Sequence, residues 1–168
     1  MIRLLLIAIA TFGVTAAVLA DPVKKVAVVD SDKLSKECAE SFIKALLDSK
    51  VDEALKLCAT PFREQDGTKS ETLDNLKKEF GRPPPAGIEI KVGESIALDK
   101  FNESSKKNGD KEMSADTIKE YGEFLGKDGR IVLLEVKMMG QALPSEDRPH
   151  MLIRVKDGKA QIVGVGGR

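Results

Sequence analysis

The C-terminal part of the chain contains a β-hairpin signal that constrains the fold more than any other feature. Two apolar-alternating runs, MLIRVK and KAQIVGV, are separated only by Asp157 and Gly158. An Asp-Gly pair between such runs is typical of a two-residue hairpin turn, because both turn positions need the left-handed backbone that these residues tolerate. The earlier run IVLLEVKMM, residues 131–139, alternates in the same way. Residues 131–168 are therefore predicted to form an antiparallel three-stranded meander, frayed at its glycine-rich end.

Helices are predicted in the first half of the chain. Residues 30–32 offer capping oxygens and acidic charge to a helix that continues to about residue 49. Residues 49–52 match a capping box for a second, shorter helix that includes Cys58 and ends before Pro61. Residues 60–66 are a short strand or a loop.

A third helix and a strand follow. Residues 68–71 form another capping box, the helix ends at Gly81 in a left-handed cap, and three prolines connect it to a strand over 87–98. Residues 101–116 are polar and predict a mobile insertion. Residues 117–125 favour a helix, with Ser114 as its cap and a strand as the alternative.

Helices that precede an antiparallel sheet indicate the α+β class. The expected architecture is one domain over 32–168, in which N-terminal helices pack on a strongly curved antiparallel sheet of about four to five strands.

The first 20 residues match a cleaved secretory signal, with Arg3, an apolar run, and small residues before a cut after Ala20. We therefore expect export to the periplasm or the extracellular space, with residues 21–31 as an N-terminal arm. The 27 basic and 27 acidic residues are interspersed, which argues against nucleic-acid binding and against stable membrane association after cleavage.

Glu94 is the residue with the strongest chemical interest. In the stretch GIEIKVGESIAL it shares the parity of Ile90, Val92 and Ile96, so a regular strand would point its carboxylate toward the concave apolar side. Burial there would raise its pKa, as in general acids and bases. The alternatives are a bulge at Gly93, or a position at the wet rim.

Other candidate residues carry weaker signals. Tyr121 and the single histidine, His150, are possible partners of Glu94, although His150 shares the more polar face of its strand and is predicted to face solvent. No metal-ligand cluster is recognised and no cofactor is expected. Cys38 and Cys58, both predicted on helices, either form a disulfide or serve as buried hydrophobes. The predicted ligand pocket on the concave face consists of Glu94, Val92, Ile96, Leu134, Val136, Met138 and Ile153.

The segments AESFIKALLDSKVDEALKLCATPF and DGRIVLLEVKM…HMLIRVKDGKAQIVGV resemble the nuclear-transport-factor-like superfamily, also called SnoaL-like. The resemblance implies a long helix, a short helix and a third helix on a strongly bent sheet that encloses a cavity. No catalytic pair of the enzymatic members matches residues here.

Three functions are open. The first is a non-catalytic exported domain that binds a small apolar ligand or a protein partner, including a second copy in a homodimer. The second is a lyase or isomerase that uses Glu94, and the third is an inhibitor or regulatory module that docks through residues 101–116.

Overall fold

The structure, a computed structural model, describes residues 30–109, 112–142 and 149–167. The predicted signal sequence, its cut after Ala20 and most of the arm lie outside these ranges. The helices are α1 (Ser31–Leu47), α2 (Val51–Leu55), α3 (Leu73–Phe80), the 3-10 helix η1 (Leu98–Lys100), α4 (Phe101–Asn108) and α5 (Ala115–Leu125). Of the helices in the described ranges, none is long and apolar enough to cross a membrane.

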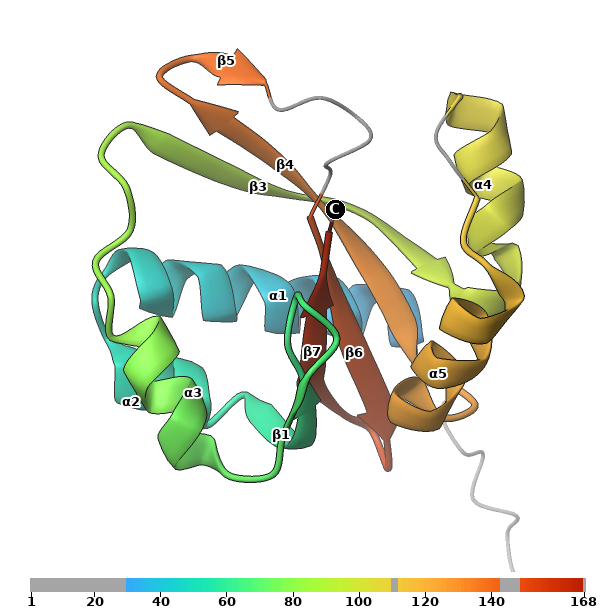
Figure 1. The fold of residues 1–168 in the computed structure, drawn as a ribbon, viewed down its shortest axis with the longest axis horizontal. Helices are drawn as coiled ribbons and strands as arrows, with labels where there is room; N and C mark the ends of the chain where they lie inside the picture. Colours follow the sequence, from blue (N-terminus) through green and yellow to red (C-terminus); the bar gives the residue numbers. More distant parts are fainter. Residues whose placement is uncertain (1–29, 110–111, 143–148, 168) are drawn as a thin grey trace, which may run out of the picture.

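One curved, mostly antiparallel sheet forms the centre of the molecule (Figure 1). Its seven strands are β1 (Cys58–Arg63), β2 (Lys69–Ser70), β3 (Ile88–Ala97), β4 (Arg130–Met138), β5 (Gln141–Ala142), β6 (His150–Lys156) and β7 (Lys159–Gly166). The order is β2-β1-β7-β6-β4-β3, with β5 paired to β4. Among the described strands, β1 and β7 are the one parallel pair. The α+β class is confirmed. The expectation was four to five strands; the sheet has five longer strands, and β2 and β5 add two residues each.

The C-terminal meander forms as the hairpin signal indicates. Asp157 and Gly158 both have positive φ, 52° and 72°, and they join β6 to β7, which lie beside β4. The prediction of a frayed end was wrong, because β7 stays paired to β6 as far as Gly166. The glycines are there because neighbouring groups come close: a Cβ on Gly164 would lie 2.8 Å from Cβ of Arg63.

The early helices differ from the prediction mainly at their ends. Asp30 caps α1 as expected, accepting a hydrogen bond from the Lys33 N–H at 3.1 Å. Neither predicted capping box forms, because α2 follows Lys50 and α3 follows Thr72 without a side-chain cap. The chain between them enters the sheet instead, so Cys58 begins β1.

Two expectations for the middle region, the left-handed cap at Gly81 and the mobile insertion, were wrong. Gly81 has a right-handed φ of −72° and is not a left-handed cap. The predicted mobile insertion contains the helix α4, which buries Phe101 and Ser105. The helix over 117–125 is confirmed as α5, which is capped by Ser114 and ends at Gly126.

The sheet is covered on both faces. On one face α1, α2 and α3 enclose a first core, in which Phe80 makes edge contacts with Phe42 and Phe62 at centroid distances of 5.3 and 6.0 Å. On the other face α4 and α5 enclose a second core around Phe101, Phe124 and Leu125. Strand residues alternate between the two cores because successive side chains point to opposite faces.

Candidate functional site

A bulge in β3 decides the position of Glu94. Val92 pairs with Leu134 and Ser95 with Val132, so one extra residue lies between the two pairs on β3. Of the alternatives for this strand, the bulge at Gly93 is therefore the correct one, and the side chain of Glu94 is exposed. A Cβ on Gly93 would lie 3.2 Å from the Leu133 carbonyl oxygen, which is closer than most side chains approach.

The bulge also reverses the face of the strand beyond it. Ile90 and Val92 pack toward the first core, but Ile96 belongs to the second core on the opposite face. Ser95 takes the side of α1, where its hydroxyl donates to Asp32 at 3.2 Å. A pocket that combined Val92, Glu94 and Ile96 on one side therefore does not form.

The remaining predicted pocket residues are mostly core. Leu134 and Ile153 are buried in the first core and Val136 is half-buried against it, whereas Met138 is 42% exposed near the end of β4. The concave space that these residues were expected to line is occupied by Phe42, Phe62 and their neighbours.

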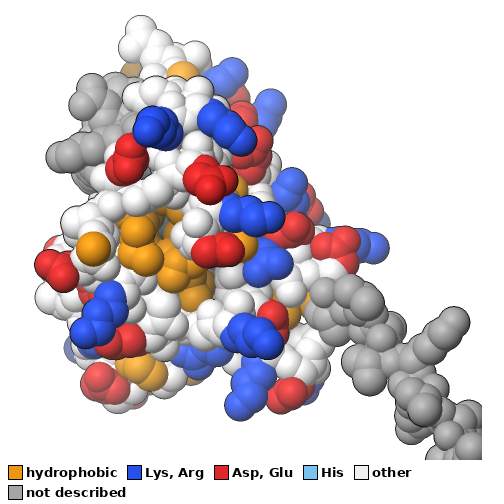
Figure 2. Space-filling model, turned by 90° about the vertical axis from the view of Figure 1, so that its right-hand side faces the viewer, with side chains coloured by type: hydrophobic (Ala, Val, Ile, Leu, Met, Phe, Trp, Pro, Cys, Tyr) orange, Lys and Arg blue, Asp and Glu red, His pale blue; other side chains and the backbone are white. Residues whose placement is uncertain are grey.

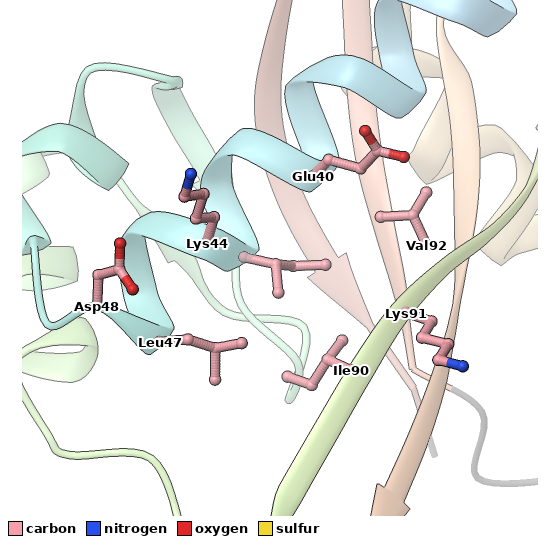
Figure 3. A pocket seen from close by; sticks show the side chains of 8 residues that line it. Glu40, Lys44, Leu47, Asp48, Ile90, Lys91 and Val92 are labelled. Atoms are coloured by element: carbon pink, nitrogen blue, oxygen red, sulfur yellow. The ribbon is translucent and has the colours of Figure 1, made fainter.

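A groove lies at the border of the first core, between α1 and the edge strand β3 (Figure 3). It has a volume of about 450 Å³ and is open to solvent. Its lining residues are Glu40, Ile43, Lys44, Leu47, Asp48, Ile90, Lys91 and Val92. Of the predicted pocket residues, Val92 alone lines it.

The groove has an apolar floor and a charged rim. Ile43 and Leu47 of α1 face Ile90 and Val92 of β3, and Leu47 is 40% exposed. Glu40 and Lys44 of α1 stand along the rim with Asp48, the residue that caps the C-terminus of α1, and Lys91 points away from α1 (Figure 3). Such a shape suits an apolar group held by a few polar contacts at its margin.

Tyr121 and His150 are brought together under α5, on the other side of the sheet. Tyr121 Oη lies 3.0 Å from His150 Nε2, and both side chains are buried. The prediction that His150 faces solvent was wrong, because α4 and α5 cover the face of β6 on which it lies; its ring is 6.0 Å from that of Phe101.

Arg63 and Glu120 extend this pair into a polar cluster. Arg63 Nε donates to Glu120 Oε1 at 3.0 Å, and the guanidinium carbon lies 4.9 Å from the centre of the Tyr121 ring. Burial raises the pKa of Tyr121, and the Arg63 charge opposes that shift in part. Sequence reasoning missed Arg63, whose strand was one of two alternatives for residues 60–66.

The two cysteines are buried free thiols in the first core. Cys38 Sγ donates to the Ala160 carbonyl at 3.6 Å, and Cys58 Sγ donates to the Ala54 carbonyl at 3.5 Å. Burial raises the pKa of Cys38 to about 11 and that of Cys58 to about 12. Cys38 and Cys58 therefore serve as buried hydrophobic residues and do not form a disulfide in the structure.

The surface shows no concentrated charge on the face that α4 and α5 cover. There, basic and acidic side chains alternate around a hydrophobic area (Figure 2). Within the described ranges, no group of three or more His, Cys, Asp or Glu side chains could hold a metal ion.

The first three helices have the order and relative lengths that the family resemblance implies. A 17-residue helix, a 5-residue helix and an 8-residue helix pack in that order on one face of a curved sheet. Solved structures described as NTF2-like are similar to the chain in fold. The α+β class and this order of helices agree with the expectation from the sequence, and α4 and α5 follow on the other face of the sheet.

The solved structures to which the chain is similar have little sequence in common with it. An NTF2-like protein of unknown function from Cytophaga hutchinsonii is 11% identical, with 80% of this chain and 88% of that chain covered and a TM-score of 0.43. A second such protein, from Shewanella baltica, is 6% identical over 79% and 87%, with a TM-score of 0.44.

A third similar structure is the association domain of CaMKII from C. elegans, 13% identical over 82% and 97%, with a TM-score of 0.45. No family model matches the chain, and no curated protein matches it. The likeness is one of fold alone.

Proposed function

We propose that this chain is an exported, non-catalytic binding domain, and that the groove between α1 and β3 receives an apolar part of a ligand or of a protein partner. Export rests on the basic start, the apolar run and the small residues that precede Asp21. Binding rests on one observation, the open apolar floor formed by Ile43, Leu47, Ile90 and Val92.

The volume of the groove supports this use. At about 450 Å³ it falls within the roughly 300–1,000 Å³ of small-molecule sites. Leu47 of this floor is partly exposed to water, whereas Phe42 and Ile43 of the same helix are buried in the first core. Covering this apolar surface would favour binding by about 25 cal/mol for each Å² removed from water.

The placement of the polar residues supports a non-catalytic role. Glu94 is exposed on a bulge, whereas Tyr121 and His150 are buried under α5, so the three candidates for acid–base chemistry do not share an accessible site. None of the three lines the groove. A reaction centre needs its groups within reach of one substrate.

The test compares two exposed leucines. Leu47 in the groove and Leu73 on α3 have nearly equal exposure, 40% and 39%, so Leu47→Lys and Leu73→Lys change the surface equally. Fluorescence of the neutral apolar probe N-phenyl-1-naphthylamine is measured with dilute protein. We expect Leu47→Lys to weaken probe binding at least tenfold and Leu73→Lys to leave it unchanged. Equal effects of the two variants, or no binding by the monomeric chain, would refute the proposal.

A further inference from the structure

We infer that the apolar partner of the groove is a second copy of this chain, joined to the first through the free edge of β3 in an antiparallel register centred on Ile90. This inference rests on the proposed function of the groove and names its occupant. It gives a two-fold symmetric dimer in which the two sheets become continuous.

β3 is an edge strand with one open side. Within the described ranges, β3 pairs with β4 alone. The hydrogen-bond pattern between β3 and β4 determines which backbone groups of β3 point to the open side. The Met139 N–H donates to the Gly87 carbonyl at 2.9 Å, and the next pair is Ile88 with Met138. In an antiparallel ladder, bonded and non-bonded pairs alternate, so Ile88–Met138 is a non-bonded pair.

The alternation assigns each residue of β3 to one side. Glu89 and Lys91 direct their backbone groups to β4, and Ile88, Ile90 and Val92 direct theirs to the open edge. The Ile88 N–H already donates to the Pro85 carbonyl at 3.4 Å, which leaves the other groups of these residues for a partner. An unpaired edge of this kind is a template for another strand.

A second β3 fits this edge with its own free groups. With Ile90 on the two-fold axis, the two Ile90 residues exchange hydrogen bonds, and the Val92 N–H of each copy donates to the Ile88 carbonyl of the other. The side chains of Ile88, Ile90 and Val92 then lie on the face of α1, where they cover the apolar floor at Ile43 and Leu47.

Charge selects this register over its neighbours. Glu89 and Lys91 are exposed on the opposite face. The register centred on Ile90 places Glu89 of each copy opposite Lys91 of the other, which gives two pairs of opposite charge. The pair is of the non-bonded type, in which side chains lie closest. A shift centred on Glu89 would oppose two glutamates, and one centred on Lys91 would oppose two lysines, both unfavourable.

Charge reversal tests the register by sedimentation velocity over a wide range of protein concentration. We expect the native chain to dimerise, Glu89→Lys and Lys91→Glu each to raise the dimer dissociation constant at least tenfold, and the double reversal to restore it. Glu94→Lys, an equal charge change at an exposed position of β3 outside the pairing, is the control and should dimerise normally. A native monomer, or a dimer that neither single reversal weakens, overturns the inference.

Cross-linking provides a measurement that does not depend on reversed charges. Within one chain, Glu89 and Lys91 also pair with Lys137 and Glu135 of β4, so a charge reversal can weaken the fold. Circular dichroism therefore first verifies that each variant is folded. In a mixture of Glu89→Cys and Lys91→Cys chains, the opposed Cα atoms would lie about 4.5 Å apart, within disulfide range. Mild oxidation should link the mixture faster than either variant alone. Equal rates overturn the register.

The same proteins separate this inference from the proposed function. If the native chain is monomeric but binds the apolar probe in a manner that depends on Leu47, the groove function stands and the dimer does not. If it is monomeric and binds no probe, both fail. If the inference holds, monomeric Glu89→Lys binds the probe more strongly than the native dimer does, because its groove is uncovered.

Discussion

Tyr121 Oη lies 3.0 Å from His150 Nε2 in a space that α5 and β6 close on two sides and Gly166 of β7 closes on a third. A Cβ built on Gly166 would lie 2.6 Å from Tyr121 Oη and would overlap the His150 ring. The pair therefore depends on the absence of a side chain at position 166.

The substitution Gly166→Ala should destabilise the fold. The added methyl group has to displace the Tyr121 and His150 rings from a packed core, and overpacking of this kind costs about 1–3 kcal/mol. The free energy of unfolding in urea measures the effect. An unchanged midpoint would mean that the space beside Gly166 accommodates a methyl group.

Gly122→Ala on α5 is the matched control. A Cβ there would be 3.6 Å from Leu98 Cδ2, an ordinary contact, and alanine favours a helix over glycine by about 1 kcal/mol. We expect the variant to be as stable as the native chain or more stable. A loss equal to that of Gly166→Ala would show that any added methyl near α5 is harmful.

Tyr121→Phe should reduce the free energy of unfolding by about 1 kcal/mol, because it removes one buried hydrogen bond and keeps the ring. The contact with the Arg63 guanidinium is retained, since it needs only the aromatic face. Chemical denaturation checks this value. A variant as stable as the native protein would show that the Tyr121–His150 bond adds nothing net to the fold.

Alkaline pH should destabilise the protein through its thiols. Below about pH 9 both thiols are protonated in either state, so their contribution is fully present. Above pH 9 the unfolded thiols ionise while the folded thiols, with pKa values of about 11 and 12, stay protonated. The unfolded state then binds fewer protons, and stability falls by at most about 1.4 kcal/mol per thiol and pH unit.

The double variant Cys38→Ala/Cys58→Ala isolates this effect. The pKa of Tyr121 is also raised and acts in the same direction at higher pH, so the comparison is the slope of stability between pH 9 and 10. We expect a shallower slope in the variant. Equal slopes, together with no free thiols in the denatured native chain, would indicate a disulfide instead.

Long, strongly patterned elements were predictable from the sequence. The hairpin at Asp157–Gly158, α1 with its Asp30 cap, and α5 with its Ser114 cap depend on local chemistry that the residues themselves carry. Cys58 was assigned to a helix because its apolar spacing continued that of α2. The chain instead pairs β1 with β7, a contact between distant residues that no local pattern contains.

The site was harder to predict because it depends on registration between elements. The bulge at Gly93 was one open alternative, and only the pairing with β4 decides that Glu94 is exposed and that Ile96 faces α5. His150 could not be placed by the polarity of its own strand, because α4 and α5 cover that face. The groove likewise requires α1 beside the edge of β3, which periodicity does not specify.

The most direct test of the groove is a methyl ¹H–¹³C NMR titration of dilute protein with N-phenyl-1-naphthylamine. The prediction is that methyl signals of Ile43, Leu47, Ile90 and Val92 shift as the probe binds, while those of Ile131, Leu152 and Val163 in the second core do not. Shifts confined to the second core, or no shift at the four groove residues, would contradict the assignment of the groove as the binding site.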